Sequence, residues 1–155
     1  MAWGPFGSSG VRGKAWRVVS AISALLRGRM AAESLMVDAC TVHRPGEPET
    51  DPTTGKVTVS KTMIYGPDST GGGKCKIQQT IAQASGKDSA EHRFTVQEAR
   101  WDTPVGSGPF MVNDIVTMTS SGLDPHMPGR VYRVTELFHK TFATAQRCRL
   151  EEVTA

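Results

Sequence analysis

Residues 112–134 read VNDIVTMTSSGLDPHMPGRVYRV, and this stretch decides the fold. Polar and apolar side chains alternate from Val112 to Thr119, which predicts a half-buried β-strand. The turn formers of SSGLDP then interrupt the alternation, and a second short strand is predicted at residues 131–134, after Pro128 and Gly129. This unit of two strands joined by a rigid polar loop contains no residue that is placed for catalysis. The stretch therefore indicates a small β-domain whose loops contact other proteins.

Three residues of this loop are predicted to fix its conformation. The side chain of Asp124 can accept a hydrogen bond within the turn, Pro125 fixes φ, and Gly129 permits a positive φ. This structural turn needs no ligand, and we expect the neighbouring His126 to be solvated.

The chain from Met36 onward continues the two-residue period. Candidate strands are Met36–Arg44, Lys56–Tyr65, Lys74–Gln79, Arg93–Arg100, Phe110–Thr119, Gly129–Leu137 and Thr144–Val153. Residues 45–55 are expected to be a loop too long for a tight hairpin, with further loops at residues 65–73 and 80–92. Because no helix separates these strands, the sequence predicts a mainly β domain at residues 36–155, an antiparallel barrel or sandwich of about seven strands.

The N-terminal part has a different period. Residues 1–13 are rich in Gly and Ser and are expected to be a flexible lead-in. Residues 14–35 predict an amphipathic, basic α-helix, which Gly28 weakens. Two interpretations stay open, a helix packed on its own domain and a helix packed on a neighbouring subunit. The candidate interface residues are Arg17, Val18, Ile22, Leu26, Arg27 and Met30.

The positive charge is concentrated at the N-terminus. Of the formal net charge of +3, residues 1–35 carry +4 (five basic side chains against Glu33) and the remaining 120 residues carry −1 (13 basic, 14 acidic). Nucleic-acid binders usually spread basic residues over a folded domain. The distribution instead favours an arm that docks on an acidic partner or reaches toward DNA.

The sequence predicts no enzyme, cofactor or metal site. Residues 71–74 (GGGK) lack phosphate-loop spacing, and the four histidines are scattered. The three cysteines form no CxxC motif and are expected to be buried thiols in a reducing cytoplasm. Trp101 is expected at the rim of the domain rather than as a base-stacking platform. No apolar run approaches membrane-spanning length, so no membrane partner is expected.

With these elements placed, the chain resembles a known group of proteins. The likeness begins where the predicted helix runs into the motif AESLM (32–36). The further motifs are ACTV (39–42), DPTTG (51–55), IYG (64–66) with CKIQ (75–78), NDIV (113–116), and LDP (123–125) through GRVYRV (129–134). Their order is similar to that of the small head–tail connector proteins of long-tailed actinobacterial phages, the head-to-tail stopper or head-completion class. The likeness runs from about Ala31 to Glu152. It departs at Asn113, where the family pattern leads us to expect Gly.

The resemblance implies a structural virion protein of the head–tail neck, made in the cytoplasm of the bacterial host. Such proteins form a homo-oligomeric ring of six or twelve copies between the portal or adaptor and the tail terminator or tail tube. They retain packaged double-stranded DNA, with a loop from each subunit reaching into the channel. The candidate channel-loop residues are Gln83, Ser85, Lys87, Asp88 and Glu91, and residues 65–73 are the second choice.

Two other functions stay open from the sequence. A tail terminator or minor tail protein would also be a small β-protein that assembles into a ring. A nucleic-acid-binding β-barrel would require basic side chains to converge on one face of the barrel.

Overall fold

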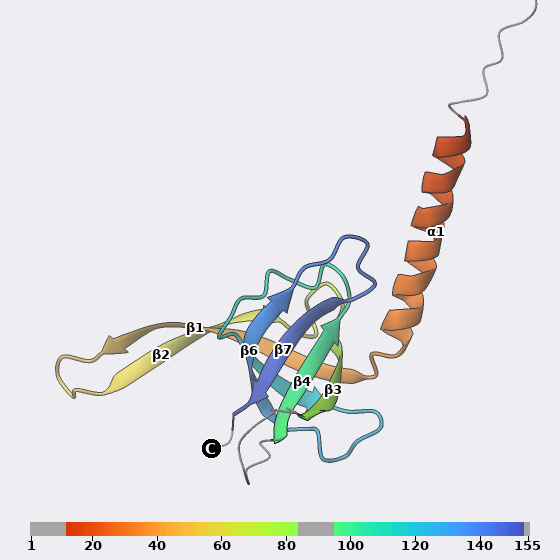
Figure 1. The fold of residues 1–155 in the computed structure, drawn as a ribbon. Coiled ribbons are helices and arrows are strands. Elements are labelled where there is room, and N and C mark those ends of the chain that lie inside the picture. The colour runs from red at the N-terminus through yellow and green to blue at the C-terminus, as the bar shows by residue number, and fades with distance from the viewer. Residues whose placement is uncertain (1–11, 84–94, 154–155) are drawn as a thin grey trace, which may run out of the picture.

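The computed structural model of the chain describes residues 12–83 and 95–153 (Figure 1). One helix precedes seven strands: α1 (Arg12–Ser34), β1 (Asp38–Thr50), β2 (Val57–Tyr65), β3 (Lys74–Gln83), β4 (Thr95–Thr103), β5 (Ile115–Ser120), β6 (Val131–Phe138) and β7 (Gln146–Glu152). The prediction of a mainly β fold with an N-terminal helix is confirmed.

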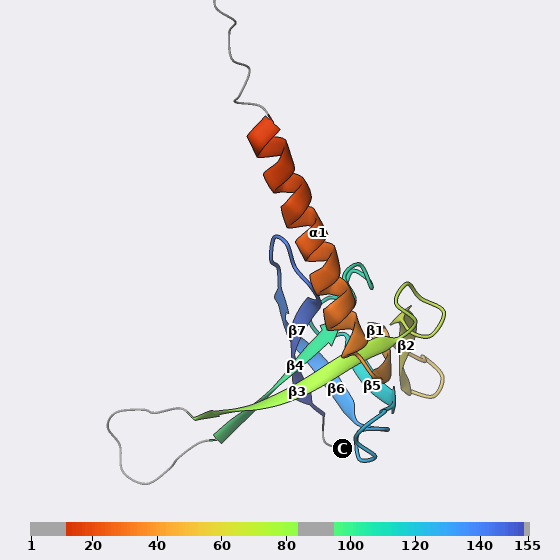
Figure 2. The same cartoon turned by 90° about the vertical axis from the view of Figure 1, so that its right-hand side faces the viewer.

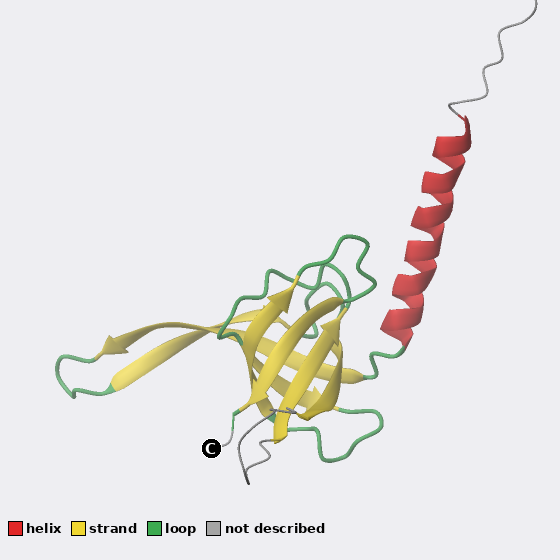
Figure 3. Cartoon of the chain, viewed as in Figure 1, coloured by secondary structure: helices red, strands yellow, loops and turns green. Residues whose placement is uncertain are grey.

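The seven strands form one antiparallel sheet that nearly closes on itself (Figure 3). The strand order is β2-β1-β3-β4-β7-β6-β5, and β1 also pairs with β5. Six strands therefore make a ring, while β2 pairs only with β1 and lies outside it. The pairing of β1 with β3, which closes the ring, is short and consists of the pairs Asp38–Cys75 and Ala39–Lys74. A barrel, rather than a sandwich, is the form that the sheet takes.

Strand β1 belongs to two structures at once. Its first part pairs with β5 from Ala39 to His43, and its second part pairs with β2 out to Thr50, opposite Val57. This hairpin projects from the barrel (Figure 1). The prediction of a loop at residues 45–55 is wrong, because the strand continues through Pro45 and Pro48. Proline cannot donate a backbone hydrogen bond, so it is tolerated where one edge of a strand has no partner.

The turn of the hairpin is short and is held by one carboxylate. Asp51 accepts hydrogen bonds from the backbone N–H of Thr53 at 2.8 Å and from Oγ1 of Thr54 at 2.6 Å. These bonds lower the pKa of Asp51, Thr54 having the larger effect. Gly55 takes a φ of +67°, which a side chain would disfavour. The sequence DPTTG thus closes the hairpin.

The core fills the barrel with inward-facing side chains of every strand of the ring. Its fully buried members include Tyr65, Trp101, Val116 and Tyr132. The indole of Trp101 lies 4.7 Å from the ring of Phe110, centroid to centroid. The expectation that Trp101 lies at the rim is wrong, because β4 continues to Thr103 and Trp101 takes an inward position.

All three cysteines are buried free thiols, as predicted. Burial raises the pKa of Cys148 to about 12 from an ordinary value of 9.0. The pKa of Cys40 is raised as well, chiefly by its hydrogen bond with Cys75 and then by burial. The folded protein therefore keeps both thiols protonated.

We expect alkaline pH to destabilise the protein through these thiols. A raised folded-state pKa contributes stability that is complete below the unfolded value of 9.0 and is lost as pH rises toward the folded value. Between pH 9 and 12, Cys148 alone should lower the free energy of unfolding by about 1.4 kcal/mol per pH unit. Urea unfolding at pH 8 and pH 10, with C148A as control, measures this. An equal pH dependence in C148A would contradict the assignment.

Candidate functional site

Helix α1 contacts the barrel only through its C-terminal part, and the rest projects away from it (Figure 2). Arg29 Nε donates a hydrogen bond to the carbonyl oxygen of Ala143 at 3.1 Å, and Lys74 Nζ lies 3.2 Å from Oε1 of Glu33. Gly28 lies against Thr144, whose Cγ2 would be 3.1 Å from an added Cβ. The glycine that weakens the helix therefore permits its close approach to the barrel.

The same helix exposes a row of apolar side chains, which we call the helix stripe: Val19, Ile22, Leu26 and Met30. Steps of three and four residues place them on one face, and 46–73% of each residue is accessible. The predicted interface residues Ile22, Leu26 and Met30 belong to this stripe, and Arg27 is also exposed. Arg17 and Val18 lie in α1, but their side chains are outside the described part.

The projecting hairpin, residues 45–61, is a second exposed surface, and we call it the hairpin arm. Val57 and Val59 alternate along β2, are about half exposed, and pair with Thr50 and Pro48 of β1. Exposed charged side chains also occur on the arm, the acidic Glu47, Glu49 and Asp51 and the basic Lys56 and Lys61. Glu49 pairs with Thr58 and therefore lies on the face opposite Val57 and Val59. The arm thus combines apolar side chains with exposed charges of both signs.

A buried ion pair fixes the root of the arm. Arg44 donates through Nε to Oδ1 of Asp114 at 2.8 Å and through Nη2 to Oδ2 at 2.9 Å. The same Nη2 reaches the carbonyl oxygen of Pro109, and the N–H of Met111 donates to Asp114 at 2.7 Å. Asp114 is buried and Arg44 partly so. The pair therefore ties the arm to the turn before β5.

Asn113 lies in this turn with a backbone conformation that favours glycine. Its φ of +74° lies in the left-handed region, which glycine adopts freely and which asparagine tolerates better than most residues. Its N–H donates to the carbonyl oxygen of Val134 at 2.8 Å. Asparagine at position 113 is therefore compatible with a turn that favours glycine.

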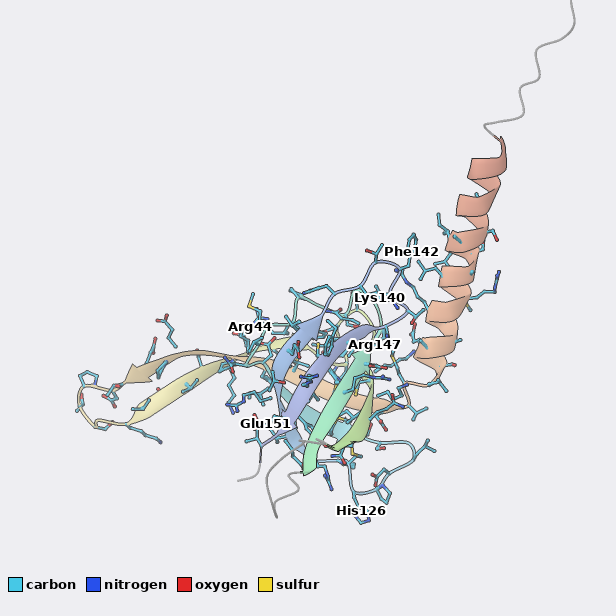
Figure 4. The ribbon with its side chains drawn as sticks, in the orientation of Figure 1. Arg44, His126, Lys140, Phe142, Arg147 and Glu151 are labelled. Carbon is cyan, nitrogen blue, oxygen red and sulfur yellow. The ribbon has the colours of Figure 1, made fainter. Side chains whose placement is uncertain are left out.

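A pocket of about 280 Å³ opens on the outer face of the barrel beside α1. We call it the basic pocket, and its lining residues are Arg100, Phe138, Lys140, Ala143, Ala145 and Arg147. Figure 4 shows Lys140 and Arg147 on the side of the barrel that faces the helix, with Phe142 above them. The lining thus consists of three basic and three apolar side chains.

One buried carboxylate organises the cations of this pocket. Asp102 is contacted by Arg100 Nε at 3.1 Å, by Arg147 Nε at 3.7 Å and by Lys76 Nζ at 3.7 Å. Arg147 Nε is buried and has no hydrogen-bond partner in the part of the chain that the structure describes. Lys140 makes no ion pair there either. Of the three cations that line the pocket, Arg100 and Arg147 are thus partly compensated by Asp102, which Lys76 contacts from outside the pocket.

Sequence reasoning missed both the Arg44–Asp114 pair and the basic pocket. The two members of the pair are 70 residues apart. The side chains of the pocket come from β4, β6, β7 and the β6–β7 loop. The net charge of −1 for residues 36–155 gives no sign that basic residues gather at one place. The alternation of Arg147 and Arg149 with apolar residues in β7 was the one available signal.

The structural turn at residues 121–129 forms local hydrogen bonds. Oδ1 of Asp124 accepts from the N–H of His126 at 2.9 Å, and the exposed His126 points outward (Figure 4). Pro125 lies between them, and Gly129 takes a φ of +86° while its N–H donates to Met118 at 2.8 Å.

The predicted channel loop falls largely outside the described residues. Ser85, Lys87, Asp88 and Glu91 lie in the segment that is not described, and Gln83 is the last residue of β3, without a described side chain. The second candidate, residues 65–73, folds back on the barrel. Gly73 there has a φ of +71°, and a Cβ would lie 3.0 Å from the carbonyl oxygen of Cys40. This loop packs tightly at its base.

Metal-binding clusters and membrane-spanning helices are both absent from the described residues. Residues 12–83 and 95–153 hold no group of three or more His, Cys, Asp or Glu side chains that could bind a metal ion. Within the same residues, no helix has the length and apolar character to cross a membrane.

Comparison with protein families matches residues 28–151 to a family of unknown function (DUF6093). The chain belongs to this family. The match begins near the C-terminal end of α1 and extends to Glu151 in β7, so it includes the hairpin arm and the basic pocket. No curated protein and no solved structure matches the chain.

Proposed function

We propose that the protein is a structural virion neck protein, a head-to-tail stopper that forms a ring between the portal or adaptor and the tail. The observation that carries the proposal is a small barrel from which α1 and the hairpin arm project, each exposing apolar side chains that the described residues leave uncovered (Figure 1). A subunit of a ring contacts a neighbour on each of two sides and needs two different surfaces. Contiguous exposed apolar surface is typical of interaction sites.

The β3–β4 hairpin supports the channel assignment. Its pairing runs without interruption from Lys76–Asp102 to Gln83–Thr95, and the two strands project from the barrel at this end (Figure 2). The first-choice channel loop therefore starts from a projecting position, unlike residues 65–73. In the proposed ring this loop closes the channel over packaged DNA and the outer faces meet the adaptor and the tail.

Deleting the gene from its phage tests the proposed function. Electron microscopy of the lysate should show free tails beside tailless heads that have lost their DNA. DNA-filled heads with finished but abnormal tails would move the protein to the tail as a terminator or minor tail component. Complementation with the wild-type gene is the control.

A second candidate function is binding of nucleic acid, and one observation favours it. The outer face of β3, β4, β7 and the β6–β7 loop gathers Lys76, Arg100, Lys140, Arg147 and Arg149. Three of these cations, however, contact Asp102, and Arg149 lies 2.9 Å from Glu136. Much of the positive charge is thus compensated within the protein, which favours the neck role.

A further inference from the structure

We propose that the unpaired edge of β2 binds the unpaired edge of β3 in a neighbouring copy of this chain, so that one sheet continues from subunit to subunit. The inference rests on the ring of the proposed function and names a contact that builds it.

Strand β2 presents an open edge along its exposed length. It pairs with β1 alone, and no other strand of the described residues lies along its second edge. Every residue from Val57 to Met63 is exposed. Such an edge carries a row of N–H and C=O groups without partners, which makes it a template for pairing with another strand.

The hydrogen bonds of the hairpin arm show which backbone groups face this edge. The N–H of Asp51 donates to the carbonyl oxygen of Lys56 at 3.0 Å, so these two residues form a hydrogen-bonded pair. Bonded and non-bonded pairs alternate in an antiparallel ladder, which makes the first and third residues after Lys56 non-bonded. These residues are Val57 and Val59. Their N–H and C=O groups therefore point away from β1, toward the open edge.

The opposite edge of the arm, on the outer half of β1, is closed by proline. Pro48 lies opposite Val59, in a non-bonded pair whose backbone nitrogen faces outward, and Pro45 lies opposite Lys61. Neither proline has an N–H group to donate. Lys61, in contrast, leaves the N–H groups of β2 in place. Because proteins use proline to keep strand edges from pairing, the arm has one closed edge and one open edge.

The occupant of such an edge is an extended strand, because main-chain hydrogen bonds then satisfy both backbones. Within residues 12–83 and 95–153, β3 supplies the other long edge that has no proline. Strand β3 pairs with β1 only at Lys74 and Cys75, whereas its second edge pairs with β4 as far as Gln83. From residue 76 onward, the edge of β3 on the side of β1 is therefore open.

The backbone groups of β3 are oriented toward this open edge at every second residue. The N–H of Cys40 donates to the carbonyl oxygen of Gly73 at 2.9 Å, which marks a hydrogen-bonded pair. Two residues further along the same ladder, the groups of Cys75 also face β1. Those of Ile77 and Gln79 face the same side, beyond the start of β1. Both open edges thus offer donors and acceptors at the spacing of a β-ladder.

Pairing of β2 with β3 suits a ring. Neighbours related by rotation about the axis of a ring contact each other through two different surfaces. The two edges belong to hairpins that project from the barrel in different directions (Figures 1 and 2). Pairing of β2 with β2 would instead be two-fold and would join copies in pairs. In the proposed contact, the arm of each copy lies along the strands that lead to the channel loop of the next copy.

Matched proline substitutions on the two edges of the arm test the proposal in the full-length protein. V59P removes an N–H group from the open edge. T50P removes one from the closed edge, because Thr50 lies in the non-bonded pair with Val57. Neither N–H has a partner within the ladder of the arm, so both variants should fold, which circular dichroism checks.

The two variants should differ in self-association, measured by analytical ultracentrifugation. V59P should weaken it about tenfold or more, because a donor is lost and a carbonyl group of the neighbour stays unpaired. Q79P makes the same change on the edge of β3 and should have the same effect. T50P should associate as the wild type does. Equal association of V59P and T50P would overturn the proposal.

Cross-linking identifies the partner edge without proline. Because all three native cysteines are buried, introduced surface thiols are the accessible ones. A short bis-maleimide should join K61C on one chain to Q79C on another. It should not join K61C to K140C, since Lys140 lies on the β6–β7 loop beside α1 (Figure 4).

Three results of the cross-linking would overturn the proposal. The first is an equal yield for the two pairs of variants. The second is K61C joined chiefly to K61C, which would indicate two-fold pairing of β2. The third is a wild-type chain that stays monomeric together with variants that do not cross-link. The gene deletion reports on the neck role whichever edges pair, so the contact and the neck role can fail separately.

Discussion

Replacing Arg44 with methionine is expected to lower the free energy of unfolding by about 3–5 kcal/mol. Methionine keeps much of the length of the side chain but leaves the carboxylate of Asp114 without its partner. Asp114 is 1% exposed, so water cannot replace the two lost hydrogen bonds. Removing one member of a buried ion pair leaves an uncompensated charge in a region of low dielectric constant. Urea unfolding followed by circular dichroism measures the change.

The matched control is R133M, because Arg133 makes an ion pair of similar length in a different environment. Arg133 Nη2 lies 2.7 Å from Oε2 of Glu151, with both side chains about half exposed. Exposed pairs contribute less than about 1 kcal/mol. Equal effects of R44M and R133M would show that burial of Asp114 does not govern the stability of the arm root.

The second large effect is expected on assembly. The double variant I22D/L26D should abolish formation of the ring while leaving the barrel folded. Both side chains belong to the helix stripe, and about half of each residue is exposed in the single chain. Charges placed there should therefore cost little within the subunit. Their burial at a subunit boundary would be strongly unfavourable.

The control for this variant is A24D/A31D, which introduces the same two charges on another face of α1. Ala24 and Ala31 are exposed and lie outside the stripe. The control should assemble as the wild type does in light scattering after gel filtration. Unchanged assembly of I22D/L26D would refute the role of the stripe in the ring.

Much of the fold was predictable because the two-residue period of a barrel strand is a local property. The alternation around Val116 and Met118 gave β5, and both side chains are buried. The hairpin arm escaped prediction because Pro45 and Pro48 resemble loop residues. They are tolerated because the outer half of β1 has a partner on one edge only.

The candidate site was less predictable, for physical reasons. The helix stripe is local, so the spacing of Ile22, Leu26 and Met30 indicated it. The basic pocket depends on strand register, which places Arg147 opposite both Asp102 and Phe138. Nothing in the local sequence of β4 or β7 specifies that pairing, because register is set across the whole closed sheet.

The course of β1 through both barrel and arm has a mechanical consequence. A strand of 13 residues is about 43 Å long at roughly 3.3 Å per residue, and it is continuous from the closure of the barrel to the tip of the arm. Tension applied at the tip runs along this strand into its hydrogen bonds with β5. Bonds that lie across the direction of pull are loaded together, in shear, rather than opened one after another. A neighbour that grips the arm therefore pulls on the barrel as a whole.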